Sequence, residues 1–111
     1  MDIVFHTEKL AKEFNTQKIL IKRHGPERAK RIARRLKQLG AATVLEDLRN
    51  TPGRCHELSG NRAGELTLDL DGPYRLIFKP EHNPPPTKED GGLNWTQVTA
   101  VIILGVEDTH E

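Results

Sequence analysis

Residues 65–79 hold two short stretches in which apolar residues recur at every second position, separated by a turn. The apolar positions are Leu66, Leu68 and Leu70 in the first stretch and Tyr74, Leu76 and Phe78 in the second. Asp71-Gly72 between them favours a tight turn, because both residues adopt turn conformations readily. Successive side chains of a strand point to opposite faces. The segment is therefore predicted to be an antiparallel hairpin with one apolar face, and Arg75 lies on its other face.

The first half of the chain predicts helices instead. Thr7 is a candidate N-cap, and the apolar spacing after it indicates a helix that continues toward His24. Gly25-Pro26 breaks this helix, and Pro26 suits the first position of the next one. The next helix carries an apolar stripe from Ala29 to Leu39 and is expected to end at Gly40. Its other faces carry basic residues, namely Arg28, Lys30, Arg31, Arg34, Arg35 and Lys37. Residues 44–49 can add one short helix.

The remaining segments complete an α+β fold. Residues 3–5 and 54–58 are predicted strands, and residues 80–92 are a proline-rich loop. Residues 98–106 are apolar on both faces, which is typical of a strand inside a sheet. We expect one domain, residues 1–111, with the order β-α-α-β-β-β-β. Two N-terminal helices would pack on a small, twisted and mainly antiparallel sheet.

Composition indicates an ordinary globular chain of 111 residues with a formal net charge of +1. The longest apolar run is too short to span a bilayer, and no secretory signal opens the chain. The single cysteine, Cys55, fits a reducing cytoplasm and is interpreted as a small strand residue. Residues 1–50 carry a balance of +6 and residues 51–111 a balance of −5. The basic half either attracts nucleic acid or an acidic partner peptide, or simply solvates a helix.

Arginines and histidines of the second half suggest chemistry on a phosphodiester. The candidate residues are Arg54, His56, Arg62, Arg75, Asp108 and His110. Cleavage of RNA by its own 2′-OH needs a base, an acid and positive charge on the phosphorane. Histidine suits the proton transfers, and arginine donates paired hydrogen bonds to phosphate oxygens. The alternatives are a structural or surface histidine, solubilising arginines and a weaker divalent-metal site at His56, Asp108 and His110. The sequence has no nucleotide-binding glycine loop.

With these residues in view, the chain resembles RelE/ParE-superfamily toxins of bacterial toxin–antitoxin systems, in the HigB (host-inhibition-of-growth) branch. The resemblance rests on the run from Arg54 through Leu58-Ser59-Gly60-Asn61-Arg62, on Tyr74-Arg75-Leu76, and on the terminal Glu107-Asp108-Thr109-His110. It implies a RelE-like, microbial-RNase-like α+β domain without cofactor or metal. By matching motif positions, the resemblance implies that His56, Arg75, Asp108 and His110 are catalytic. It also implies that Arg54 and Arg62 bind RNA phosphate.

The same resemblance implies a ribosome-dependent mRNA endoribonuclease, or mRNA interferase, that acts in the cytoplasm. Its partners would be the ribosome, mRNA and a cognate helix-turn-helix antitoxin (HigA-like), and it would reach operator DNA only through the antitoxin. Two alternatives stay open at this point. One is a toxin of the same fold that inhibits a protein target such as gyrase. The other is a non-catalytic toxin–antitoxin component, a killer-suppression or binding module.

Overall fold

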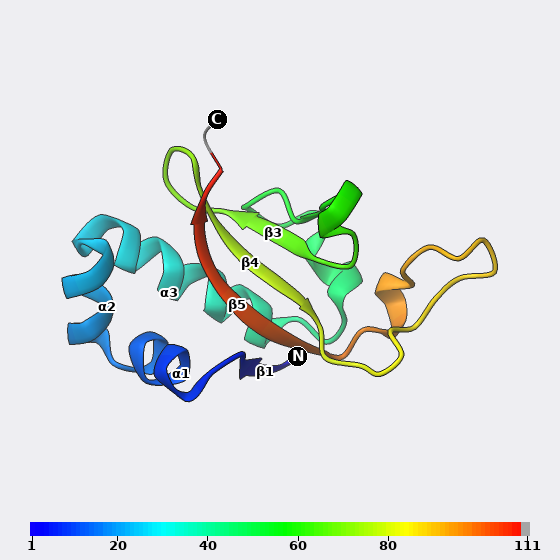
Figure 1. The fold of residues 1–111 in the computed structure, drawn as a ribbon, viewed down its shortest axis with the longest axis horizontal. Helices are drawn as coiled ribbons and strands as arrows, with labels where there is room; N and C mark the ends of the chain where they lie inside the picture. The colour runs from blue at the N-terminus through cyan, green and yellow to red at the C-terminus, as the bar shows by residue number, and fades with distance from the viewer. Residues whose placement is uncertain (110–111) are drawn as a thin grey trace.

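The computed structural model describes residues 1–109 and shows helices packed on one face of a mixed sheet (Figure 1). The α-helices are α1 (Glu8–Asn15), α2 (Gln17–His24) and α3 (Pro26–Ala41). The strands are β1 (Asp2–Phe5), β2 (His56–Glu57), β3 (Leu66–Asp69), β4 (Tyr74–Pro80) and β5 (Ala100–Asp108). Short 3-10 helices lie in the connections, namely η1 (Leu45–Leu48), η2 (Gly60–Arg62) and η3 (Trp95–Gln97). The predicted α+β class is confirmed.

Over the described residues, the sheet has five strands in the order β1-β5-β4-β3-β2. β1 pairs with β5 in parallel, and the other neighbours are antiparallel. The apolar last strand thus lies inside the sheet, as its sequence predicted, although it begins at Ala100 and runs to Asp108. None of the helices in residues 1–109 has the length and apolarity that a membrane crossing needs.

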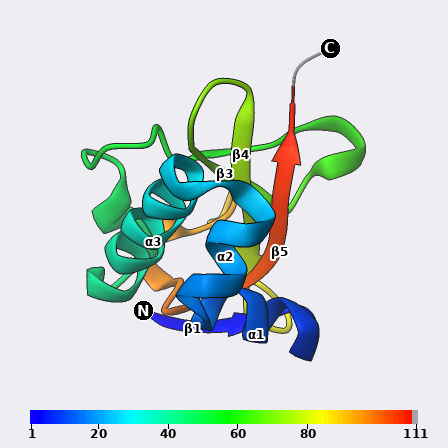
Figure 2. The same ribbon diagram turned by 90° about the vertical axis from the view of Figure 1, so that its left-hand side faces the viewer.

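The two faces of the sheet differ in what covers them. Figure 2 shows α2 and α3 on one side of β5 and the segment around η2 on the other side. The predicted apolar positions of the hairpin, including Leu68 and Phe78, all belong to the core that faces the helices. Asp69 and Arg75 are cross-strand neighbours on the opposite face, as the alternation predicted for Arg75.

The predicted single helix from Thr7 toward His24 is wrong, because it is divided at Thr16. The predicted N-cap is confirmed, since the Thr7 hydroxyl accepts a hydrogen bond from the Leu10 N–H at 3.0 Å. At Thr16 the backbone is extended, with φ −123° and ψ 103°. Threonine has a low propensity for the interior of a helix. The bend also lets α2 fold back, so that His24 reaches the buried Glu13 carboxylate of α1 at 2.8 Å.

Arg35 of α3 is buried, whereas the sequence placed it among the basic residues outside the apolar stripe. It is 5% exposed, and its guanidinium contacts the end of β3. Its Nε donates to the backbone oxygen of Asp69 at 2.8 Å, and its Nη1 donates to Gln38 Oε1 at 2.7 Å. α3 begins at Pro26 as predicted and ends at Ala41, one residue beyond Gly40.

The strand predicted over residues 54–58 is wrong in length, because β2 contains only His56 and Glu57. The residues before it are not extended: Gly53 has φ 108° and Arg54 has φ 47°. A Cβ atom on Gly53 would lie 2.9 Å from Arg35 Nε and 3.1 Å from Leu68 Cδ2. The close approach of Arg35 therefore sets the conformation of the chain as it enters β2.

The buried guanidinium of Arg35 gives a stability prediction. Arg35→Met keeps an unbranched side chain but leaves the Asp69 carbonyl without its donor. We expect the free energy of unfolding to fall by about 2 kcal/mol, as for other hydrogen bonds to charged groups. Urea denaturation followed by circular dichroism measures the change. Arg34→Met, on the exposed neighbour, is the matched control and should stay within about 0.5 kcal/mol of wild type. An equal loss in both variants would contradict the role of Arg35.

Candidate functional site

Two arginines meet at one carboxylate on the sheet face opposite the helices. Asp69 Oδ2 accepts from Arg54 Nε at 2.6 Å, and Asp69 Oδ1 lies 2.9 Å from Arg75 Nε. Arg75 Nη1 also donates to the backbone oxygens of Gly72 and Tyr74, at 2.7 and 2.9 Å. The Arg54 side chain is 69% exposed and the Arg75 side chain 20%. We call this face, with Arg54, Asp69, Arg75 and Glu107, the arginine face.

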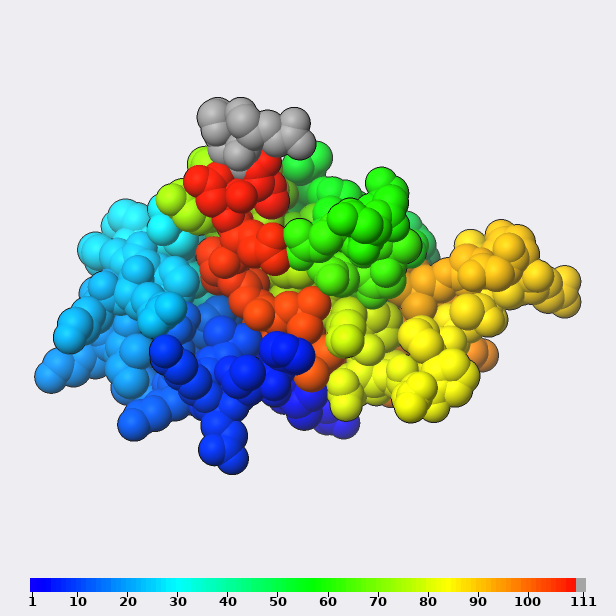
Figure 3. Space-filling view, in the orientation of Figure 1, coloured from blue at the N-terminus to red at the C-terminus, as the bar shows by residue number. Residues whose placement is uncertain are grey.

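Arg62 connects η2 to the end of β5 across the same face. Its Nη1 and Nη2 donate to the two oxygens of Glu107 at 2.9 and 2.8 Å, and its Nε and Nη2 donate to Glu65 Oε1 at 2.8 and 2.6 Å. Figure 3 shows the segment around η2 packed beside the end of β5. Since Glu107 is also the cross-strand neighbour of Arg75, Arg62 holds the η2 segment against the arginine face.

The ion pairs shift the pKa values of some of the groups involved. Hydrogen bonds from Arg62 hold the pKa of Glu107 below its ordinary value, against partial burial, which acts in the other direction. The Asp69 carboxylate raises the pKa of Arg54, mainly through its hydrogen bond. The Glu107 carboxylate is therefore an anionic acceptor for Arg62 at neutral pH.

His56 lies on the arginine side of the sheet, one row from Asp69. It pairs with Thr67 across β2 and β3, and Thr67 alternates with the core leucines. His56 Nδ1 contacts the backbone oxygen of Arg54 at 2.8 Å. A carbonyl oxygen can only accept, so Nδ1 carries the proton, and Nε2 is the basic nitrogen of the neutral ring. Arg54, whose carbonyl makes this contact, is the one non-glycine residue with positive φ in residues 1–109.

The terminal acidic residues divide between the two faces of the sheet. Asp108 is the cross-strand neighbour of Tyr74, whereas Glu107 is the neighbour of Arg75. Because the strand is pleated, the acid beside Arg75 is Glu107 and Asp108 takes the other face. The remaining candidate, His110, lies outside the described residues. The structure thus brings together Arg54, His56 and Arg75, with Arg62 joining them through Glu107.

Sequence reasoning missed the three carboxylates that partner these arginines, Glu65, Asp69 and Glu107. The signal for Asp69 was present in the hairpin. Closure of the turn at Asp71-Gly72 places Asp69 opposite Arg75, which the register confirms. No comparable sequence pattern predicts the partners of Arg62. The reason is that η2 folds back over the sheet through a segment without a repeating pattern.

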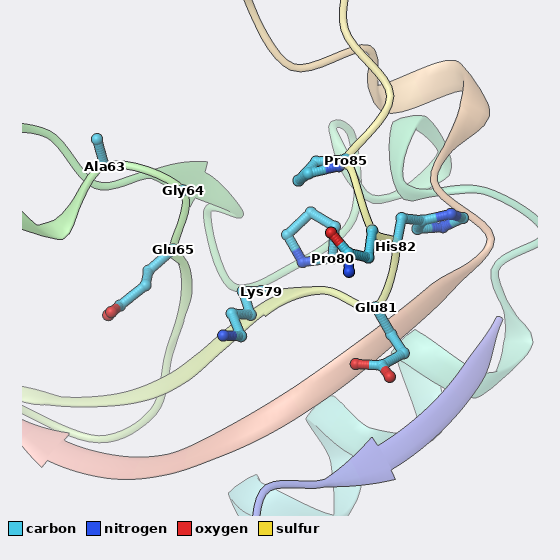
Figure 4. A pocket seen from close by; sticks show the side chains of 9 residues that line it. Ala63, Gly64, Glu65, Lys79, Pro80, Glu81, His82 and Pro85 are labelled. Atoms are coloured by element: carbon cyan, nitrogen blue, oxygen red, sulfur yellow. The ribbon is translucent and has the colours of Figure 1, made fainter.

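Other reactive groups do not form a further cluster in the described part of the chain. Burial raises the pKa of the Cys55 thiol to about 12, so it stays protonated at neutral pH. Residues 1–109 contain no group of three or more histidine, cysteine or acidic residues that could hold a metal ion. A depression of about 520 Å³ lies beside the end of β4, and Figure 4 shows that Glu65, Lys79 and Glu81 do not point to a common centre there.

Comparisons with solved structures identify the fold. The chain is similar to a YoeB/ParE toxin from Agrobacterium tumefaciens, with a TM-score of 0.60, 11% sequence identity and all of both chains covered. It is also similar to a YoeB dimer from Staphylococcus aureus, with a TM-score of 0.53 and 14% identity. In that comparison all of this chain and 97% of the other are covered. No protein-family model and no curated protein sequence matches the chain. The chain therefore has the RelE-like fold of YoeB/ParE toxins.

The Arg62–Glu107 pair gives a prediction for acidity. A carboxylate with a lowered folded pKa stabilises the fold above its unfolded pKa, and this stabilisation is lost as the pH falls through the folded pKa. We expect NMR titration to give Glu107 a pKa below its ordinary value in wild type and a higher pKa in Arg62→Gln. The pKa of Asp71, which Arg28 lowers, is the internal control and should not move. An unchanged Glu107 titration in Arg62→Gln would contradict the pair.

Proposed function

We propose that the protein is the toxin of a toxin–antitoxin system and cleaves mRNA on the ribosome. The reaction would be a metal-independent attack of the ribose 2′-OH on the adjacent phosphate. A cognate helix-turn-helix antitoxin of the HigA-like type would hold the enzyme inactive in the cytoplasm. The fold likeness to YoeB/ParE toxins supports the toxin class, and the arginine face supports the nuclease.

One observation carries the proposal: the guanidiniums of Arg54 and Arg75 converge on a single anion, the Asp69 carboxylate. A phosphate offers the same charge sign and the same kind of acceptor oxygens. A phosphodiester that displaces the carboxylate would be held by two arginines. Their fixed charge would then stabilise the phosphorane, where negative charge accumulates during attack.

Proton transfer would involve His56, whose Nε2 is the basic nitrogen of its neutral ring. An imidazole can both accept and donate a proton in the physiological pH range, so it can take the 2′-OH proton or return one to the 5′ oxygen. His110 is the proposed partner for the second transfer. Asp108 lies on the other face of β5, so it would assist only by orienting His110. Arg62 would contribute to phosphate binding only by exchanging Glu65 or Glu107 for the substrate.

A second candidate function is a toxin-fold binding protein without nuclease activity, which would act on a protein target or through the antitoxin. It is favoured by the charge balance of the face. Three arginines, Arg54, Arg62 and Arg75, are paired with three carboxylates, so the cluster has no excess positive charge. Attraction of RNA depends on such an excess.

Inducible expression in bacteria without a partner separates the two candidates. We expect growth arrest with new mRNA 5′ ends for wild type. Arg75→Ala and His56→Ala should each lower the rate of cleavage at least about a hundredfold, because each removes a group that acts in the transition state. Mapping of 5′ ends on cellular mRNA measures the cuts. Lys79→Ala, on the exposed side of β4, is the control and should cleave like wild type.

Other outcomes of this experiment would reject the nuclease. Arrest without cuts would favour a protein target. Neither arrest nor cuts, from protein that circular dichroism shows to be folded, would favour the non-catalytic module. Cuts that survive both substitutions would remove Arg75 and His56 from the site.

Asp69→Asn tests the same anion site with a substitution that should strengthen RNA binding rather than weaken it. The amide removes the competing negative charge while it keeps the shape of the side chain. If phosphate takes the place of this carboxylate, single-stranded RNA should bind more tightly to the variant. The slope of log Kd against the logarithm of the salt concentration should become steeper, by the amount expected for about one additional phosphate contact. Fluorescence anisotropy with a labelled oligonucleotide at several salt concentrations measures both. Asp90→Asn, in the exposed loop, is the matched control. Equal affinities of wild type and Asp69→Asn would reject the anion site.

A further inference from the structure

Thr67 lies in the middle of β3 on the same side of the sheet as the arginine face, and it is almost completely buried. It is 2% exposed, and its side chain points away from the core leucines with which it alternates. Its cross-strand neighbours are His56 on β2 and Ile77 on β4. The next residue of β3 on this side is Asp69, the carboxylate that two arginines share. Thr67 therefore adjoins both the proposed proton-transfer residue and the proposed phosphate position.

The Thr67 hydroxyl has no hydrogen-bond partner. Its Oγ1 is the one buried side-chain oxygen or nitrogen atom in residues 1–109 of which this is true. A buried hydroxyl without a partner destabilises a fold, and valine would replace it by a methyl group without that cost. Valine is also a favourable residue in strands. Stability alone thus favours valine at this position, so we look for a ligand of the hydroxyl outside the protein.

Arg62 covers the row of the sheet that Thr67 and Ile77 share. Its Nη2 donates to Glu65 at 2.6 Å and to Glu107 at 2.8 Å. Glu65 lies before Thr67 along the chain of β3, whereas Glu107 belongs to β5, two strands away and beyond that row. The guanidinium that joins the two carboxylates therefore passes over the row. This accounts for the burial of Ile77, which is 0% exposed although it is not part of the core beneath the helices.

The cover over Thr67 is held by partly exposed ion pairs. The Arg62 side chain is 38% exposed, and its acceptors Glu65 and Glu107 are 26% and 43% exposed. Water weakens ion pairs with this degree of exposure. A substrate phosphate offers Arg62 acceptor oxygens of the same kind. A ligand that takes Arg62 away from these carboxylates would uncover the Thr67 hydroxyl.

The place of Thr67 in the sheet indicates which group of a substrate its hydroxyl would meet. Alternate residues of a strand are about 6.6 Å apart, so a phosphate in the place of the Asp69 carboxylate leaves Thr67 beside the adjoining ribose. His56, which is proposed to exchange a proton with the 2′-OH, is the cross-strand neighbour of Thr67. A threonine hydroxyl can donate to a 2′-OH and accept from it. The 2′-OH is also the group by which proteins distinguish RNA from DNA.

We propose that Thr67 is a specificity-determining residue whose hydroxyl binds the ribose 2′-OH of an RNA substrate once Arg62 has moved. The inference rests on the proposed function, because it uses the same phosphate position. It adds a residue that recognises the sugar, whereas the arginines recognise phosphate. DNA offers the Thr67 hydroxyl no such partner. The protein should therefore bind single-stranded RNA more tightly than DNA of the same sequence.

The test compares three side chains at position 67. Fluorescence anisotropy measures Kd for a labelled single-stranded RNA of A, C and G only, and for DNA of the same sequence. We expect Thr67→Val to lose RNA affinity about five- to tenfold, as for one hydrogen bond, with unchanged affinity for DNA. Thr67→Ser keeps the hydroxyl and should keep the preference for RNA. Thr87→Val makes the same change in the exposed loop and is the matched control.

Thermal stability gives a second readout, with a sign that a structural role would reverse. Because the Thr67 hydroxyl has no partner in the described part of the chain, Thr67→Val should melt a few degrees above wild type. The same variant should bind RNA less well. Thermal unfolding followed by circular dichroism measures Tm and shows that each variant is folded. If the hydroxyl instead held the fold together, Thr67→Val would melt below wild type.

Several results would overturn the role of Thr67. These are equal affinities of wild type for RNA and DNA, an RNA preference that persists in Thr67→Val, equal losses for both nucleic acids, and a lowered Tm. Mapping of mRNA 5′ ends in cells tests the proposed function separately. If wild type cuts mRNA while Thr67→Val keeps the RNA preference, only the role of Thr67 is wrong. If wild type makes no cuts while the preference depends on the hydroxyl, the nuclease is rejected and the binding role of Thr67 is supported.

Discussion

Asp69 is the residue through which the layers of this protein are joined. Its backbone oxygen accepts a hydrogen bond from the guanidinium of Arg35 in the helical layer. Its N–H donates to the backbone oxygen of Gly53 at 2.7 Å. Its carboxylate holds Arg54 and Arg75 on the other face. One residue at the end of β3 thus joins α3, the entry to β2 and the arginine face. The relative positions of the two arginines depend on the buried contact beneath them.

The sheet separates two surfaces with different electrostatic character. On the helical side, positive charge along α3 stands beside the exposed Ile21, and no carboxylate lines the depression between α3 and the junction of α1 with α2. On the other side, positive charge is matched by carboxylates in close contact. The first surface therefore carries positive charge that its own lining does not neutralise. The second would bind an anion only by exchange, which favours a ligand that offers several acceptors at once, such as a phosphodiester.

Much of this arrangement could be predicted from the sequence. Alternation in the hairpin fixed which residues face the core, and turn closure implied the register of Asp69 and Arg75. The division of the first helix at Thr16 could not be predicted, because it depends on tertiary contacts of Glu13 with α2. Burial of Arg35 was hidden for a similar reason, since its acceptor is a backbone oxygen 34 residues away. Pairing of Arg62 with Glu107 spans 45 residues and follows no periodic pattern. Patterns in a sequence report local structure, and these contacts are not local.

The close approach of Arg35 to Gly53 has an evolutionary consequence. Any larger residue there would bring its Cβ within 2.9 Å of Arg35 Nε while the backbone keeps a φ of 108°, which side chains rarely adopt. The position therefore requires glycine for two reasons, the positive φ of the backbone and the close approach of Arg35 and Leu68. Among descendants of this chain, loss of the arginine would remove one contact at position 53 but would leave the backbone requirement for glycine. Gly53 and Arg35 should accordingly be inherited together, whereas position 69 contributes only backbone groups to this contact and can vary independently of them.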